Sequence, residues 1–380
     1  MGPISVNSNR VVVRDLSCRG SLQMVAATSR IPSRRELIRE FAQFAVSDTG
    51  RGLRLFLLDI TFYLVALGGV LFLPDLWMKL GSSVLAGMGQ AKLLSLAHDA
   101  AHDSLTGSRR LNRLLAIIAF TIFHYNYRLW VFEHHRLHHP STNDAHPDAF
   151  TPYSKAEFDK LSPIRRWLER FYRAPNIVGW GVYYILQRYW WTKIIAPTYV
   201  PLSMRASAAQ HSCLLLGYLA VFVVVLAAAP LYATNLGSVG GIILGLLLPF
   251  FVFETQNSFA IYVQHTDPQI PWFKSEVDRS GIGRTELVSV DLATPKLMAW
   301  FYHDIFSHPV HHLFPKIPCY KLRQAQDHLN ELLGPAAVVR KLGLKWWLDT
   351  TSRCKLYDWD ENRWLDFGGR PTTQRLIVAP

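Results

Sequence analysis

Four long apolar runs, arranged as two closely linked pairs, constrain the fold of this chain more than any other feature. Residues 53–73 and 76–97 form the first pair, and residues 212–233 and 239–263 form the second. Each run reaches the roughly 20 residues that a helix needs to cross a hydrocarbon core. The links within each pair leave room only for tight turns. The sequence therefore predicts an all-α integral membrane protein with four transmembrane helices in two hairpins.

Composition and charge narrow the class further. Half of the 380 residues are hydrophobic and only 18% are charged, which excludes a disordered chain and a coiled coil. The four cysteines show no CxxC spacing, so neither a disulfide framework nor a zinc ribbon is indicated. The net charge of +12 is compatible with anionic lipid or nucleic acid. The apolar runs favour lipid, and no nucleic-acid partner is expected.

The distribution of basic residues predicts the orientation. Of the 40 Lys and Arg residues, 9 precede Asp59, 14 lie between His98 and His211, and 15 follow Val263. Lys and Arg are enriched in the cytoplasmic loops of membrane proteins. Both termini and the long segment between the hairpins are therefore expected in the cytoplasm.

The apolar runs and the distribution of basic residues divide the chain into three expected parts. Ser33 and Glu36 form a capping-box pattern that predicts the start of an amphipathic helix near the N-terminus. Residues 167–191, rich in Trp, Tyr and Arg, are typical of helices lying along a membrane face. The expected parts are a cytoplasmic leader with this helix (1–50), a membrane domain (51–335) with cytoplasmic segments at 98–211 and 264–335, and a cytoplasmic tail (336–380).

Eight of the 15 histidines fall into three short boxes beside the apolar runs. The boxes are His98 and His102; His135, His138 and His139; and His308, His311 and His312. Spacings of three and four residues place imidazoles on one face of a helix. A zinc ion takes about four ligands, so eight histidines instead suit two octahedral transition-metal ions with positions left for oxygen and substrate.

Two further histidines compete for this site. His134 and His138 are also four residues apart, so His134 is an alternative to His135 in the second box. His265, at the inner end of the fourth run, is a ninth candidate ligand. The remaining histidines have no partner in a comparable box, and we expect surface or core roles for them. They are His124, His146, His211, His303 and His328.

Polar residues near the boxes are candidates for supporting roles. Glu254 and Asn257 share a helical face with His265, and they could line a channel, support a ligand or form a structural hydrogen bond between helices. Several aspartates could instead orient an imidazole through its second nitrogen or cap a helix. These aspartates are Asp99, Asp103, Asp144, Asp148 and Asp304.

The setting indicates the chemistry better than the ligand type does. Imidazole binds Fe, Zn, Cu and Ni, so it does not identify the metal. A metal pair beside a hydrophobic bundle indicates a reaction on a lipid tail, and an unactivated C–H bond requires a strong oxidant such as an oxygen-activating iron pair. A metal transporter is the alternative of a different class. Its ligands should lie near the middle of the membrane, whereas these cluster at the ends of spans and beyond.

Two stretches resemble a known family. HPVHHLFPKIPCY (His308–Tyr320) and YVQHTDPQIPWF (Tyr262–Phe273) are similar to the last box, and the stretch before it, of membrane fatty acid desaturases with three histidine boxes. Plant microsomal oleate desaturases and their bacterial relatives are the resembled members, over roughly His98 to Leu333. The first box reads HDAAH rather than HECGH, which is closer to the bacterial members.

The resemblance implies two irons bound by the eight box histidines, with His265 as an additional ligand and no further catalytic residue. It implies O2 as co-substrate and an acyl chain carried on a membrane lipid or as a thioester. The chain has no GxGxxG, iron–sulfur or haem-attachment motif, so electrons should come from a separate donor, ferredoxin or cytochrome b5 with its reductase. An acyl hydroxylase, an acetylenase or a carotenoid ketolase would use nearly the same ligands.

Overall fold

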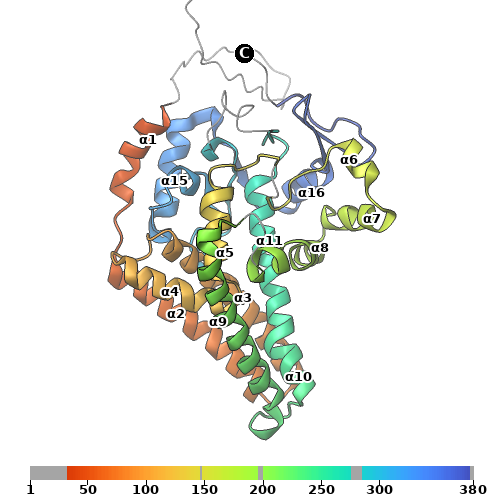
Figure 1. Cartoon of the computed structure of the whole chain (residues 1–380). Helices are drawn as coiled ribbons and strands as arrows, with labels where there is room; N and C mark the ends of the chain where they lie inside the picture. Colours follow the sequence, from red (N-terminus) through yellow and green to blue (C-terminus); the bar gives the residue numbers. More distant parts are fainter. Residues whose placement is uncertain (1–31, 146–147, 196–199, 275–284, 377–380) are drawn as a thin grey trace, which may run out of the picture.

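The computed structural model describes residues 32–145, 148–195, 200–274 and 285–376, and this part is mostly helical (Figure 1). Three of its helices are long and apolar enough to cross a membrane. They are α2 (Thr49–Phe72), α9 (Leu202–Ala227) and the continuous helix Ser238–His265. The prediction of a membrane protein is confirmed at this level.

The third of these helices is built from three parts. It starts as α10 (Ser238–Ile242), passes through a π-helical stretch, η5 (Ile243–Leu247), and continues as α11 (Leu248–His265). α9 begins at Leu202, ten residues before the expected span, and ends before a short 3₁₀ turn, η4 (Ala229–Leu231), that contains a proline. Proline has no backbone N–H to continue a helix, which explains the early end.

The second expected span, residues 76–97, is not confirmed as a membrane-crossing helix. α3 (Leu76–Ala101) has 26 residues, but it does not meet the same test of length and apolarity. It carries Lys79, Gln90 and Lys92, all buried against the rest of the protein. Length and composition therefore identify three candidate spans among the described residues, and the predicted four-span topology is not confirmed at this level. A fourth is reached only by joining α4 (Arg109–Ile122) to the segment Tyr127–His138, which meet at 113°.

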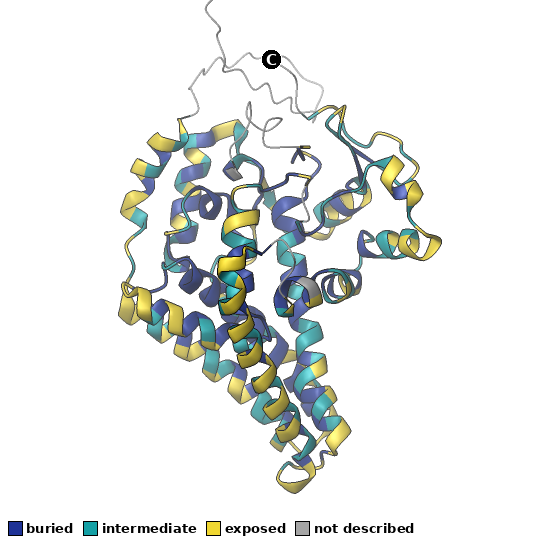
Figure 2. Cartoon of the chain, viewed as in Figure 1, coloured by how far each residue is buried: buried dark blue, intermediate teal, exposed yellow. Residues whose placement is uncertain are grey.

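The spanning helices expose apolar side chains. Leu58 and Val65 on α2, and Val221 and Val224 on α9, are all exposed. Figure 2 shows this exposure along α9 and at the lower end of the helices. A large contiguous apolar surface is unfavourable in water, so this surface suits contact with lipid.

The segments outside the spans are short helices. α1 (Arg34–Phe41) begins with the capping box predicted for Ser33 and Glu36, and a 3₁₀ turn, η1 (Ala42–Phe44), follows it. The rest of the expected leader, residues 1–31, and His146 lie outside the described residues. The Trp-rich segment contains α7, α8 and a π-helical stretch, η3. The helices of this region are α5 (Tyr127–Phe132), the π-helical η2 (Glu133–His138), α6 (Lys155–Lys160), α7 (Pro163–Tyr172), α8 (Ile177–Tyr183) and η3 (Tyr184–Ile194).

The C-terminal part holds two small sheets that the all-α prediction did not include. β1 (Asp291–Ala293) pairs in parallel with β2 (Val339–Lys341), and β3 (Leu356–Asp358) pairs antiparallel with β4 (Arg363–Leu365). The helices here are η6 (Thr285–Leu287), α13 (Lys296–Phe301), α14 (His308–Leu313), α15 (Cys319–Leu333), η7 (Gly334–Ala336) and α16 (Leu344–Arg353).

The segment after residue 335 packs against the membrane domain. Trp364 lies in a buried cluster with Trp272, Cys354 and Tyr357. Its indole N–H donates to the carbonyl oxygen of Asp267, 3.1 Å away. The described part of this segment is therefore a folded cover of the loop after α11.

Candidate metal centre

Four segments far apart in the sequence bring the histidine boxes together. The last turn of α3 holds His98, and His102 caps the same helix. The second box begins in the π-helical η2, and the third lies on the short helix α14. His265 ends α11. The convergence of the three boxes, on which the sequence interpretation depends, is present in the fold.

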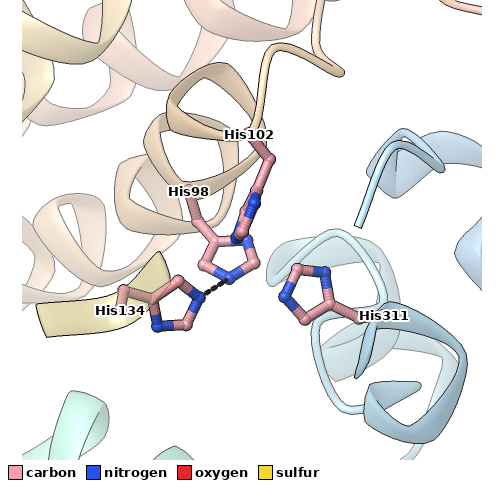
Figure 3. A group of neighbouring side chains, drawn as sticks. All are labelled: His98, His102, His134 and His311. Carbon is pink, nitrogen blue, oxygen red and sulfur yellow. Dashed lines mark hydrogen bonds between the residues drawn. The ribbon is translucent and has the colours of Figure 1, made fainter. Parts of the chain in front are cut away.

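The first group of nitrogens comes from His98, His102, His134 and His311. One ligand nitrogen from each of the four lies within 4.8 Å of the others. Figure 3 shows the four imidazoles turned toward one another from three separate elements. The Nε2 atoms of His98 and His134 are 3.0 Å apart. Three of the four side chains are buried, and His134 is half-buried.

The second group comes from His138, His265, His308 and His312, again within 4.8 Å. The Nε2 atom of His308 lies 2.9 Å from the Nε2 atoms of both His265 and His312. The structure thus places His265 beside two histidines of the third box.

His139 and His135 lie next to these groups. The Nε2 atom of His139 is 3.1 Å from the Nε2 atoms of His134 and His311, at the edge of the first group. His135 belongs to neither group of four, and its ring stacks on His102 with centroids 4.1 Å apart. The structure therefore favours His134 over His135 as the histidine facing the first group, where HxxHH spacing predicted His135.

The donor set fits transition-metal ions. Burial, followed by the charge of neighbouring histidines, lowers the pKa of His308, His311 and His312 well below the ordinary value. These imidazoles are therefore neutral at physiological pH and keep the lone pair that metal binding requires. The Nε2 atom of His102 is buried without a hydrogen-bond partner among the described residues, as expected of an atom that a cation would satisfy.

Asp148 supports the second group. Its Oδ2 atom lies 2.8 Å from Nδ1 of His138. The other ring nitrogen of His138, Nε2, is then the one left to bind a metal. Such a carboxylate fixes the tautomer and orientation of a ligand imidazole. Asp99 has a different main partner: it accepts a hydrogen bond from the backbone N–H of Cys319, at the start of α15, while its Oδ1 is 3.7 Å from Nδ1 of His98.

Glu254 and Asn257 meet at a third buried residue. The hydroxyl of Tyr125 donates to Oε2 of Glu254 at 2.8 Å, and Nδ2 of Asn257 donates to the same hydroxyl at 2.9 Å. Asn257 lines the cavity described below, whereas Glu254 is buried and is not part of the lining. Tyr125, which joins them, was not identified from the sequence.

A cavity of about 330 Å³ adjoins both histidine groups. It contacts His98 and His134 of the first group and His138, His265 and His308 of the second. Its walls come mainly from α3, α11, η2, η3 and the segment from Met298 to His308, and most of its lining is apolar. Ligand pockets commonly span about 300–1,000 Å³, so this cavity can hold part of an acyl chain beside the histidines.

Comparison with known proteins agrees with this geometry. Residues 74–342 match the family model described as fatty acid desaturase. The chain is 28% identical over 327 residues to the chloroplastic omega-6 fatty acid desaturase of Spinacia oleracea, covering 84% of this chain and 68% of that protein.

Two bacterial relatives extend the match. The chain is 24% identical over 350 residues to a fatty acid desaturase of Bacillus subtilis, covering 88% of this chain and 90% of that protein. It is 23% identical over 277 residues to the sn-1 acyl-lipid omega-3 desaturase (ferredoxin) of Nostoc, with coverages of 70% and 69%. The family model matches well over half of the sequence, so the chain belongs to the fatty acid desaturase family and is an oxidoreductase that desaturates fatty acyl chains.

Proposed function

We propose that this protein converts a CH2–CH2 unit of an acyl chain into a double bond at two histidine-bound iron ions, with O2 as co-substrate. The observation that carries this proposal is the convergence of two four-histidine groups beside one largely apolar cavity. His98, His102, His134 and His311 would hold one iron, and His138, His265, His308 and His312 the other. His139 lies beside the first group and could contribute a further ligand, and His135 is the alternative to His134.

The iron pair would supply the oxidising power that cleavage of an unactivated C–H bond requires. Overall, the acyl chain gives up two hydrogens, O2 takes two electrons and two protons from outside, and two waters form. The protein's own residues orient and protect this site. Asp148 holds the imidazole of His138, and the walls formed by α3, α11 and the segment from Met298 to Phe306 position the chain and exclude bulk water.

The membrane topology is part of the proposal. α2 and α3 pack along each other and are joined by only three residues, so a chain that crosses in α2 returns in α3. The buried polar residues of α3 face protein rather than lipid, which makes such a crossing tolerable. Together with the distribution of Lys and Arg, this supports the proposal that the metal site and both termini lie in the cytoplasm.

The electron donor is a separate protein in this proposal. A ferredoxin, or cytochrome b5 with its reductase, would deliver one electron at a time to the cytoplasmic face. The net charge of +12 favours an acidic carrier. The substrate would be an acyl chain on a membrane lipid or a thioester, since an apolar cavity of this size contacts the chain rather than its carrier.

Mass spectrometry of lipids from a host that expresses the protein tests this function. We expect acyl chains two mass units lighter, and none when His311→Ala replaces the wild type. A gain of oxygen would identify a hydroxylase, and the loss of four mass units an acetylenase. If the lipids remain unchanged although the protein holds metal and a reduced electron donor is supplied, metal transport would be favoured instead.

A further inference from the structure

A buried triad of ionisable side chains lies outside the two histidine groups. Oδ1 of Asp59 on α2 is 2.9 Å from Nζ of Lys92 on α3, and Oδ2 of Asp59 is 2.7 Å from Nε2 of His303. Asp59 is 1% exposed and Lys92 is 6% exposed. Ionisable groups within a membrane span are costly and usually functional. This triad joins both helices of the first hairpin to the loop that follows α13.

Lys92 makes a second link to the same loop. Its ammonium donates to the carbonyl oxygen of Phe301, at the end of α13, over 3.0 Å. The ring of Phe301 packs edge-to-face against Phe62 of α2, with centroids 5.6 Å apart. His303 itself has φ of 53°, in the left-handed region that non-glycine residues rarely adopt. The contacts with Asp59 and Lys92 hold the chain in this turn.

The segment held by the triad forms one wall of the cavity. Met298 and Tyr302 line the cavity, whereas Leu297 and Trp300 face away from it and are 74% and 67% exposed. The Tyr302 hydroxyl donates to the side-chain oxygen of Gln256 on α11, which also lines the cavity. This hydrogen bond connects the α13 wall to the α11 wall.

The two sides of the cavity differ in polarity. The side formed by α13 and the residues after it is lined by Met298, Tyr302, Ile305 and Phe306. Its polar groups include the Tyr302 hydroxyl with its partner on Gln256, and the amide of Gln264, which donates to the carbonyl oxygen of Ile305; no charged side chain is among these residues. A different side carries Glu133, which pairs with Arg188 and Lys193. The apolar side therefore suits the methyl end of a chain whose carrier end lies elsewhere.

We propose that Met298 and Tyr302 form the end wall of the acyl cavity and set the chain length that the enzyme accepts, with the Asp59–Lys92–His303 triad holding this wall in place. The inference rests on the proposed desaturase function and assigns its specificity to named residues. An apolar pocket discriminates against each methylene that it excludes by a factor of about ten or more.

The experiment offers cells that express each variant a series of fatty acids of increasing chain length and measures the ratio of long to short unsaturated products. Met298→Trp fills the wall and should lower this ratio about tenfold for each methylene that it excludes. Met298→Ala should raise the ratio. Leu297→Trp is the matched control, because its side chain lies on the exposed face of the same helix and should leave the ratio unchanged.

A wild-type ratio in both Met298 variants would overturn the assignment of the end wall. Tyr302→Phe removes only the hydrogen bond to Gln256 and should broaden the range of accepted chains. For the triad, Lys92→Met should also broaden the range of accepted chains, while the iron content stays at the wild-type level. A wild-type product ratio in Lys92→Met would exclude the role proposed for the triad. Absence of any unsaturated product from the wild type would instead count against the proposed function, since the ratio is defined only for an active enzyme.

Discussion

The Nε2 atom of His134 lies 3.0 Å from the Nε2 atom of His98, whereas His135 stacks on the ring of His102 from outside the first group. We therefore expect His134→Ala to lower the iron content, and to abolish product formation, more strongly than His135→Ala. Metal analysis of the two purified variants compares them directly. A greater loss of iron in His135→Ala than in His134→Ala would identify His135 as the ligand, as the HxxHH spacing predicts, and would contradict the arrangement of η2.

His265 should be as important as the box histidines. Its Nε2 atom is 2.9 Å from that of His308, so His265→Ala removes one nitrogen of the second group and leaves the first group intact. We expect the iron content to fall from two ions toward about one per chain, because a site that loses one of its few ligands binds metal far more weakly. His328→Ala is the control, since His328 is partly exposed, pairs with Glu40 and belongs to neither group. Two irons in His265→Ala would exclude His265 as a ligand.

Asp148→Asn tests how the second group is oriented. The change keeps the shape of the side chain but removes the negative charge beside Nδ1 of His138. Loss of such a partner typically lowers metal affinity or activity by about 10–100-fold, and we expect a loss in this range. Asp159→Asn provides a matched control, because Asp159 forms only an exposed pair with Lys155. Equal iron affinities for the two variants would show that Asp148 does not support the site.

The stability of the metal-free protein should depend on pH. Burial lowers the pKa of His308, His311 and His312 well below the ordinary value, so they remain neutral in the folded state. Unfolded histidines titrate near about 6.5. Below that pH the unfolded state binds more protons, and the free energy of unfolding decreases as pH falls, by up to about 1.4 kcal/mol per pH unit for each histidine.

Thermal unfolding of the iron-free protein in detergent, measured from pH 7.5 to about pH 5, checks this sign. We expect the unfolding temperature to fall with pH. A constant or rising unfolding temperature over this range would mean that these imidazoles are solvated, and that the buried groups described for α14 do not form without metal.

Much of the site was predictable because metal binding leaves a local pattern. Spacings of three and four residues identified the boxes, and the polar residues on one face of α11 identified His265. The choice between His134 and His135 was not predictable, because a π-helical turn changes which side chains share a face and no spacing rule signals it. Asp148 was only one of several nearby aspartates, since its contact with His138 depends on how an irregular loop folds back.

The fold, like the site, was predictable from the sequence only in part. Hydrophobic length predicted α2, α9 and the helix Ser238–His265, but it treated α3 as equivalent to them. α3 differs from them because it buries Lys79, Gln90 and Lys92 against the rest of the protein. Lys92 is the basic member of the Asp59–Lys92–His303 triad. Asp59, the acidic member of the triad, interrupts the first apolar run. The ion pair between Asp59 and Lys92 was not identified from the sequence, and neither was their third partner, His303, which lies 211 residues from Lys92.

Iron stoichiometry tests the central claim most directly. We expect two iron ions per chain in the wild-type protein purified from membranes, measured by elemental analysis, with Mössbauer spectroscopy showing iron in a nitrogen-rich environment. We expect His311→Ala to lose at least the iron of the first group. A single metal ion in the wild-type chain, or two irons retained in His311→Ala, would contradict the assignment of two histidine-bound irons.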